Sequence, residues 1–285
     1  MILVTGAAGK TGKAVIRALA SRGVGVRGMV HRPAQAAAVR ALGAAEVVVG
    51  SFEDTQAWKE AAAGADAIYH ICPNFSRSEI NFARTAVAAA KANHIERFVY
   101  HSVLHPQIEA MPHHWRKMQV ENLLFASGIE CTVLQPTAYM QNIAGAWRGI
   151  IEEGVFRIPY PAETRLSLVD LDDVADVAAL VLTSADHGGA TYELVGTAPL
   201  SQRDVAAAIG STLGKDIQIE AETPEAWEGT ARAASLGEQA RAELEAMFRY
   251  YADYGLIGNS NALRWLLGRA PADLTAFIER MRCSG

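Results

Sequence analysis

Short apolar runs rich in β-branched residues alternate with alanine-rich stretches along the first half of the chain. The apolar runs predict strands, and the longer stretches between them, with helical spacing of their apolar residues, predict helices. Strands are expected over residues 2–5, 24–30, 46–49, 67–71, 98–100 and 131–134. Helices are expected over residues 10–21, 33–42, 79–92 and 113–127.

This alternation decides how the strands pair. Each helix carries the chain back across the sheet in a right-handed crossover, so consecutive strands run parallel. Strands that are apolar throughout are typical of a sheet covered by helices on both faces. The sequence therefore predicts an α/β fold with a Rossmann-like, doubly wound parallel sheet.

Beyond Pro136 the alternation stops, and the next residues read as irregular, with a helix near residues 144–152. A helix over residues 170–182 and a strand over residues 191–195 are expected to return to the sheet. Ser201, followed three residues later by an acid, has the pattern of a capping box and predicts a further helix. The remainder reads as mainly helical.

Two domains follow from this order of elements. We expect a dinucleotide-binding Rossmann domain over residues 1–136, to which residues 166–196 return. A small, mainly helical substrate-binding domain is expected over residues 137–165 and 197–285.

Composition and charge narrow the class of protein. The chain has 285 residues, of which 50% are hydrophobic and 20% charged, so it can bury a substantial core. A formal net charge of −5 disfavours nucleic acid as a ligand. Three cysteines without a Cys-x-x-Cys pair fit a reducing cytoplasm better than a disulfide framework or a thiolate zinc site. We recognise no leader and no membrane-spanning run, and expect a cytoplasmic protein without membrane contact.

The sharpest local signal is a strand that runs into Gly-x-x-Gly-x-x-Gly and then into a helix. Glycine permits the tight turn, the approach of a diphosphate to the backbone and close packing of the helix on the sheet. The amino end of the helix offers free N–H groups to the phosphates. The residues expected to bind a dinucleotide here are Gly6, Ala8, Gly9, Lys10, Thr11 and Gly12.

A phosphate-binding loop of nucleotide hydrolases is the nearest alternative, because Gly9-Lys10-Thr11 matches its last three positions. That motif needs a further glycine five residues before Gly9, where this chain has Val4. The hydrolase interpretation is therefore disfavoured.

The end of the second strand indicates which dinucleotide binds. An acid there would accept hydrogen bonds from the ribose of NAD, whereas a cation suits the 2′-phosphate of NADP. The chain has His31 and Arg32 at this point and no acid. The planar fork of an arginine suits a phosphate, so NADP is favoured. If Arg32 is only a solvated loop residue, NAD remains the alternative.

Several stretches match, in order, the motifs of one family. They are Val4-Thr5-Gly6-Ala7-Ala8-Gly9-Lys10-Thr11-Gly12, Phe98-Val99-Tyr100-His101-Ser102, His113-His114-Trp115-Arg116-Lys117, Val120-Glu121-Asn122-Leu123-Leu124, Thr132-Val133-Leu134-Gln135-Pro136-Thr137-Ala138-Tyr139-Met140-Gln141-Asn142, Leu168-Val169-Asp170-Leu171-Asp172-Asp173-Val174-Ala175, Thr191-Tyr192-Glu193-Leu194 and Leu266-Leu267-Gly268-Arg269-Ala270-Pro271. Together they resemble the NmrA-like branch of the atypical short-chain dehydrogenase/reductase superfamily. The resemblance implies a substrate cleft between the two domains. It also implies reduction of quinones, enones, aryl carbonyls or imines, alongside members that act as redox sensors.

Ligands of open α/β sheets bind beyond the carboxyl ends of the strands. The residues just after those ends are therefore expected to complete the cofactor site. They are His31, Arg32, Ser51, Phe52, Cys72, Pro73, His101, Pro136, Thr137 and Tyr139, with Lys117 from the following helix.

The catalytic residues are harder to assign, because this chain departs from the Tyr-x-x-x-Lys motif that typical members of the superfamily use. Lys117 matches the lysine, which the resemblance implies would bind the nicotinamide ribose, but the position four residues earlier is His113. His113 is a candidate proton donor, with a structural histidine as the alternative. A quinone or extended enone could instead take its proton from water, with Ser102 and Tyr139 as hydrogen-bond donors.

Two functions remain open. The first is an NADPH-dependent oxidoreductase acting on a small conjugated carbonyl or quinone, with Lys117, His113 and Ser102 as catalytic candidates. The second, favoured by the missing tyrosine, is a non-catalytic NADP(H) sensor. No metal site is expected. The spacing of His101 and His105 would suit a metal ion on a helix, but the segment that contains them follows a strand and ends at a proline. A homo-oligomer remains open.

Overall fold

The computed structural model describes residues 1–223, 226–227 and 236–284. It forms two compact units. The first comprises Met1–Gln107, His113–Gln135 and Leu171–Tyr192, and the second comprises Ile108–Pro112, Pro136–Asp170 and Glu193–Gly285. No helix within the described part of the chain is long and apolar enough to cross a membrane.

The units differ from the expected domain bounds in four short segments. Residues 108–112, 136, 166–170 and 193–196, which we expected in the Rossmann domain, group with the second unit. Each segment lies where the chain passes from one unit to the other.

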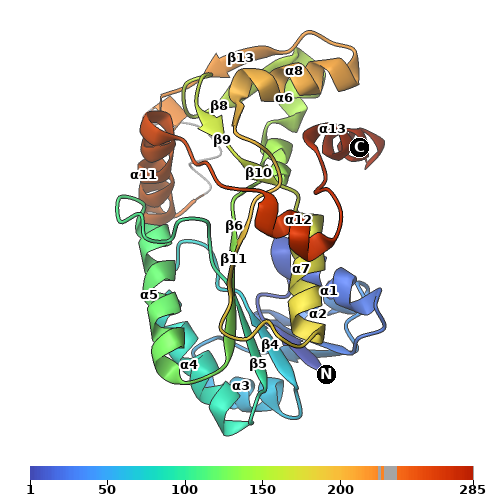
Figure 1. Ribbon diagram of the computed structural model, residues 1–285, viewed down its shortest axis with the longest axis vertical. Helices are drawn as coiled ribbons and strands as arrows, with labels where there is room; N and C mark the ends of the chain where they lie inside the picture. Colours follow the sequence, from blue (N-terminus) through green and yellow to red (C-terminus); the bar gives the residue numbers. More distant parts are fainter. Residues whose placement is uncertain (224–225, 228–235, 285) are drawn as a thin grey trace. The chain divides into compact units, whose positions relative to one another are not determined.

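A sheet of seven strands organises the first unit, in the order β11-β6-β5-β4-β1-β2-β3 (Figure 1). The strands are β1 Ile2–Val4, β2 Val26–Val30, β3 Glu46–Val49, β4 Ala67–His70, β5 Arg97–His101, β6 Cys131–Pro136 and β11 Thr191–Leu194. Neighbours from β6 to β3 pair in parallel, so their carboxyl ends meet at one edge. From β1 the chain adds β2 and β3 on one side and then β4, β5 and β6 on the other, so the boundary between β1 and β4 is the switch point of a doubly wound fold.

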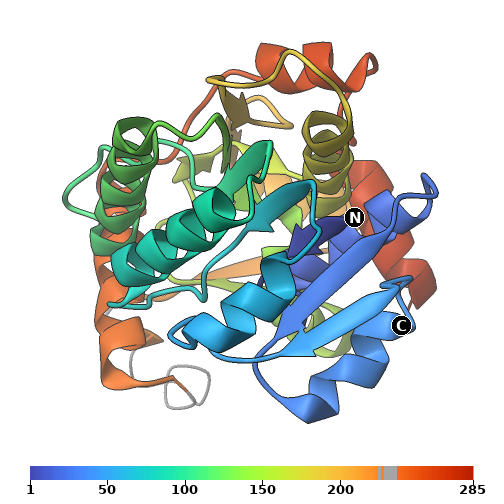
Figure 2. The ribbon, with the colours of Figure 1, turned by 90° about the horizontal axis from the view of Figure 1, so that it is seen from below.

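Helices cover both faces of this sheet. Those of the first unit are α1 Lys10–Ala20, η1 Pro33–Gln35, α2 Ala36–Arg40, α3 Thr55–Ala62, α4 Glu79–Ala92, α5 Pro112–Ser127 and α7 Leu171–Thr183. Helix α1 packs on α7, and α3 packs on α4. Buried residues of α3, α4 and α5 share one apolar core with Leu3, Ile68 and Phe98 of the strands. Figure 2 shows α3 and α4, in cyan and teal, against the sheet.

Helix α3 was not expected from the sequence. Asp54 caps it by accepting hydrogen bonds from Gln56 N at 2.9 Å and Ala57 N at 3.2 Å. Three of its four buried residues are alanines, with Trp58 as the fourth. The buried and polar residues of this segment do recur with helical spacing, so the sequence carried a signal for α3 that the prediction did not use.

The second unit contains short elements. They are β7 Ala138–Tyr139, η2 Met140–Gly145, α6 Trp147–Glu153, β8 Val155–Ile158, β9 Arg165–Leu166, β10 Leu168–Val169, β12 Leu200–Ser201, α8 Gln202–Leu213, β13 Gln218–Ala221, α11 Glu238–Tyr254, α12 Asn261–Leu267 and α13 Leu274–Ser284. The strands pair as β10–β7 and β13–β8 in parallel and β12–β9 antiparallel. These strands were missed because segments of two to four residues show no measurable alternation. The capping box at Ser201 is confirmed, with Ser201 N donating to Asp204 Oδ2 at 2.8 Å.

Helix α13 is tied to the rest of the second unit by a half-buried ion pair. Arg280 donates to the carboxylate of Asp170, which is 1% exposed. Gln141 Nε2 also donates to Asp170 Oδ1 at 2.8 Å. The same helix packs on α8. Asp170 therefore joins three segments that are distant in the sequence.

Candidate cofactor and active site

The turn after β1 requires glycine at two positions. Gly6 has φ of +57°, and a Cβ there would lie 2.9 Å from the carbonyl oxygen of Ile71. A Cβ at Gly12 would lie 2.4 Å from the carbonyl oxygen of Gly6 and 2.8 Å from Ala7 Cα. Because these neighbours are backbone atoms, any larger residue would displace the turn itself.

The turn leads into the amino end of α1. Gly9 is the N-cap of α1, with φ of −75° and ψ of 168°, and it has no side chain that could cap the helix. The first turn of α1 contains no acid. Its first N–H groups have no carbonyl partner inside the helix, and they carry the positive end of the helix dipole. Ala8, Gly9 and Lys10 are accessible, whereas Thr11 and Gly12 are buried. Such a backbone cradle fits the diphosphate of a dinucleotide.

Thr5 fixes this turn at the switch point. Ile71 N donates to Thr5 Oγ1 at 2.9 Å, and Thr5 N donates to Tyr69 O at 3.0 Å. Thr5 itself is fully buried. These bonds tie the carboxyl end of β1 to that of β4, so the glycine turn has a defined position on the sheet.

His31 and Arg32 directly follow β2 at the same edge and are both exposed. The backbone of Arg32 is held by Gln35, whose Oε1 accepts from Arg32 N at 2.9 Å. Within the described residues its guanidinium has no hydrogen bond or ion pair, so it is available for a phosphate.

Ser51 and Phe52, which follow β3, make contacts that stabilise their own loop. Ser51 Oγ accepts from Glu53 N at 3.3 Å. The Phe52 ring packs against Trp58 and Phe82 with centroid distances of 5.9 Å and 5.4 Å. Both residues are half-buried, so each still presents some surface at the strand ends.

Lys117 lies in a buried ion pair. Its Nζ donates to Glu79 Oε1 at 2.8 Å and to the carbonyl oxygen of His101 at 3.3 Å. Tyr100 OH donates to the same Glu79 oxygen at 3.0 Å. An ammonium has three N–H donors, so two are used by the protein and one remains for a ligand.

His113 lies one turn before Lys117 in α5, and its side chain is largely enclosed. Its ring contacts Phe75 and His114 at centroid distances of 5.2 Å and 4.4 Å, and its buried Nδ1 has no hydrogen-bond partner among the described residues. Burial lowers the pKa of His113 to about 2, so the imidazole is neutral at pH 7. It can form a hydrogen bond to a ligand, but it does not hold the proton of an imidazolium.

His114 is fully buried beside His113, and its pKa is lowered by the same cause. Its Nδ1 donates to the carbonyl oxygen of His105 at 3.3 Å, whereas its Nε2 has no hydrogen-bond partner in the part of the chain that the structure describes. Burial lowers the pKa of His114 to about 4. Across the described residues, no three His, Cys, Asp or Glu side chains gather as metal ligands.

Ser102 is engaged by a second buried carboxylate. Its hydroxyl donates to Glu121 Oε1, and Gln135 Nε2 donates to both oxygens of Glu121 at 3.0 Å. Burial raises the pKa of Glu121. The Ser102 hydrogen is therefore directed to Glu121, and the oxygen of Ser102 can only accept from a substrate.

Two more histidines lie at the ends of β4 and β5. His101 Nδ1 shares a hydrogen bond of 2.5 Å with Tyr69 OH, and burial lowers the pKa of both His101 and His70 to about 3. Cys72 Sγ lies 3.3 Å from His70 Nε2. Burial raises the pKa of the Cys72 thiol, which therefore stays protonated. Pro73, next in the chain, is exposed.

The three candidates after β6 belong to the second unit. Thr137 N donates to Leu194 O at 3.1 Å, and Thr137 Oγ1 donates to Ser167 O at 2.9 Å. Tyr139 is half-buried and pairs with Val169 through β7 and β10, and Pro136 ends β6. Their grouping with the residues of the first unit stays a prediction.

The model of the NmrA-like family matches residues 1–280 of the chain. This chain belongs to the NmrA-like family. The resemblance seen in the sequence is thereby confirmed, and it covers both units.

Curated relatives of this NmrA-like chain include reductases. A (4-alkanoyl-5-oxo-2,5-dihydrofuran-3-yl)methyl phosphate reductase of Streptomyces griseus is 32% identical over 220 residues, 77% of this chain and 76% of the relative. An NAD(P)H azoreductase of Xenophilus azovorans is 28% identical over 230 residues, 79% and 78% of the two chains. The NADPH-dependent quinone oxidoreductase of Escherichia coli in complex with NADPH superposes with a TM-score of 0.86, at 25% identity over 99% and 100% of the two chains.

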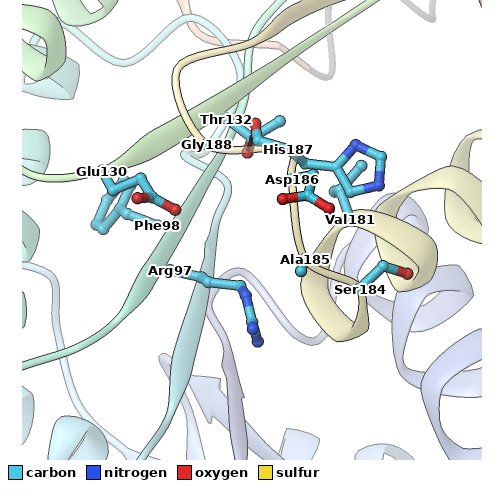
Figure 3. Close-up of a pocket in the computed structure, with 10 residues that line it drawn as sticks. All are labelled: Arg97, Phe98, Glu130, Thr132, Val181, Ser184, Ala185, Asp186, His187 and Gly188. Carbon is cyan, nitrogen blue, oxygen red and sulfur yellow. Dashed lines mark hydrogen bonds between the residues drawn. The ribbon is translucent and has the colours of Figure 1, made fainter.

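A small pocket of the NmrA-like chain lies at the opposite edge of the sheet (Figure 3). Its volume is about 110 Å³, and Arg97, the first residue of β5, marks the amino ends of the strands. It is lined by Arg97, Phe98, Glu130, Thr132, Val181, Ser184, Ala185, Asp186, His187 and Gly188. None of the residues expected to bind cofactor or substrate lines it.

Several polar residues at the carboxyl edge were not expected from the sequence. Glu79, Tyr100 and Tyr69 bind the candidates directly, and Glu121 and Gln135 hold Ser102. A usable signal is a charged residue on an otherwise apolar helix face. Glu121 shows it, since it lies one turn after Lys117 and beside the buried Val120.

Proposed function

We propose that this chain is an NADPH-dependent oxidoreductase that passes hydride to a small conjugated carbonyl compound or quinone. The observation that carries the proposal is the glycine cradle, where Gly6, Gly9 and Gly12 leave backbone N–H groups open to a diphosphate. Relatives in the family that are named as reductases support the class of reaction.

Each part of the cofactor has a residue that suits it. The cradle binds the diphosphate, and the exposed guanidinium of Arg32 binds the 2′-phosphate, which favours NADPH over NADH. The third N–H of Lys117 donates to a ribose hydroxyl, since its other two are held by Glu79 and His101. Bound NADPH would supply the hydride.

Proton transfer in this site relies on water. A hydride brings two electrons to the conjugated system, and the resulting oxyanion then takes one proton to give the hydroquinone or the saturated carbonyl compound. Neutral His113 offers a hydrogen bond to that oxygen, and Lys117 stabilises its charge. Because neither group is a strong acid at pH 7, we assign the proton to solvent.

The two units divide the work in this proposal. The first unit binds most of the cofactor, and the second binds the substrate, with Pro136, Thr137 and Tyr139 of the second unit contributing to the cofactor site. The three cysteines are free, which fits a reducing compartment, so we place the protein in the cytoplasm.

Anaerobic turnover tests this function. Oxidation of NADPH is followed with a panel of quinones, enones and aromatic carbonyl compounds. We expect turnover with at least one member of the panel and a large loss of activity in Lys117→Ala. Lys91→Ala, which removes a lysine exposed on α4, should keep the full activity. Binding of NADPH without oxidation by any compound would refute the proposed reaction.

A redox sensor is the second candidate, and one observation favours it. His113 stands where typical superfamily members have tyrosine, and burial keeps its pKa near 2, so the protein lacks an acid there. A sensor would bind NADPH stoichiometrically and leave it unoxidised across the same panel.

A further inference from the structure

The ion pair of Lys117 and Glu79 is enclosed. Their side chains are only 10% and 2% exposed, and Nζ lies 2.8 Å from Glu79 Oε1. A buried ammonium without a counter-charge would be strongly destabilising. Glu79 therefore holds Lys117 in place and also cancels its charge.

Burial keeps the histidines, the thiol and the phenol around this pair neutral at pH 7. Burial lowers the pKa of His70 and of His101 to about 3 and raises the pKa of both Cys72 and Tyr100. Glu121, one turn along α5, accepts hydrogen bonds from Ser102 and Gln135, and burial raises its pKa. Among these groups, Glu79 is the acid that contacts the ammonium of Lys117 directly.

We propose that Glu79 is a positioning residue whose charge sets the relative affinity of the site for oxidised and reduced cofactor. This inference rests on the proposed function, in which Lys117 binds the nicotinamide ribose. The oxidised nicotinamide ring carries a positive charge that the reduced ring lacks. With Glu79 present, Lys117 and Glu79 sum to zero, and the site accepts both forms.

Removing the charge of Glu79 and removing the charge of Lys117 should shift the relative affinity for oxidised and reduced cofactor in opposite directions. Glu79→Gln keeps an oxygen that accepts from Lys117 and Tyr100, but it leaves the ammonium uncompensated, which repels the oxidised ring. Lys117→Met leaves the carboxylate uncompensated, which attracts the oxidised ring. The double variant is neutral again.

The experiment measures the dissociation constants of NADP⁺ by calorimetry and of NADPH by fluorescence for each variant. We expect the ratio of the NADP⁺ constant to the NADPH constant to rise roughly tenfold in Glu79→Gln, because the uncompensated ammonium then repels the positive ring in a site of low permittivity. It should fall in Lys117→Met and return towards the original value in the double variant. Glu96→Gln is the control, because it removes an exposed acid just before β5, at the amino ends of the strands.

The outcomes separate the two proposals. If the original chain binds neither cofactor form, the proposed function is refuted. If it binds both, but the ratio is the same in Glu79→Gln and Glu96→Gln, the role of Glu79 is refuted while the function stands. Thermal unfolding shows whether Glu79→Gln folds. If Glu79→Gln does not fold, the role of Glu79 is tested by comparing Lys117→Met with the double variant. Equal ratios of the two dissociation constants in these variants refute that role.

Discussion

Gly12→Ala tests whether the backbone cradle binds the cofactor. The added Cβ would meet Gly6 O at 2.4 Å and Ala7 Cα at 2.8 Å, and both atoms belong to the turn that forms the cradle. Alanine in place of glycine favours a helix by up to about 1 kcal/mol, whereas overpacking costs about 1–3 kcal/mol. We therefore expect a net loss of stability of about 1–2 kcal/mol, because the turn must move away from α1.

Cofactor affinity should fall more than stability does. The displaced turn moves the N–H groups that face the diphosphate, and loss of one good charge-assisted hydrogen bond, about 1.5–3 kcal/mol, weakens binding by roughly tenfold or more. Urea unfolding measures the first effect, and calorimetric titration with NADPH measures the second.

A matched control separates this effect from a general response to alanine. Gly237 caps α11 with φ of −66°, and a Cβ there would meet nothing within 4 Å. Gly237→Ala should leave NADPH binding unchanged. If Gly12→Ala binds NADPH as tightly as Gly237→Ala does, the cradle is not the cofactor site.

Further predictions follow from the same structure. Arg32→Ala should weaken NADPH far more than NADH in parallel titrations, and an equal loss of both would exclude Arg32 as the 2′-phosphate ligand. The four histidines whose pKa burial lowers to between about 2 and about 4 bind protons more readily when unfolded, so their stabilisation is complete above pH 6.5 and is lost as the pH falls towards those values. Urea unfolding between pH 7 and pH 4 should show a loss of up to about 1.4 kcal/mol per pH unit per histidine, and a flat profile would contradict their burial. Arg280→Ala should destabilise α13 by about 1–3 kcal/mol, because Asp170 stays buried without its guanidinium partner. Faster amide exchange in α13 would show this, whereas Glu279→Ala, at an exposed position of the same helix, should have little effect; equal exchange in both variants would contradict the prediction.

The succession of strands along the chain and the glycine turn after the first of them could be predicted because each rests on local sequence. The glycine spacing after β1 and the short apolar runs mark the first unit without reference to distant residues. The fold class and the family are confirmed by the sheet order and by the match over residues 1–280.

The charges of the candidate site could not be predicted in the same way. Glu79 meets Lys117 across 38 positions, through the packing of side chains from α4 and α5 beside β5. Whether His113 is protonated depends on its enclosure by Phe75 and His114, which no periodicity encodes. Pairings of this kind arise only when the elements have packed.

The hydrogen bonds of Thr5 bear on the thermodynamics of association. Because Ile71 and Tyr69 already lock the turn through Thr5, the cradle keeps its shape without any ligand. A preorganised receptor loses little conformational entropy on binding, so most of the interaction energy appears as affinity. Thr5→Val, which removes the hydroxyl but preserves the volume, would make the loop adaptable and should turn rigid docking into an ordering transition with a larger unfavourable entropy.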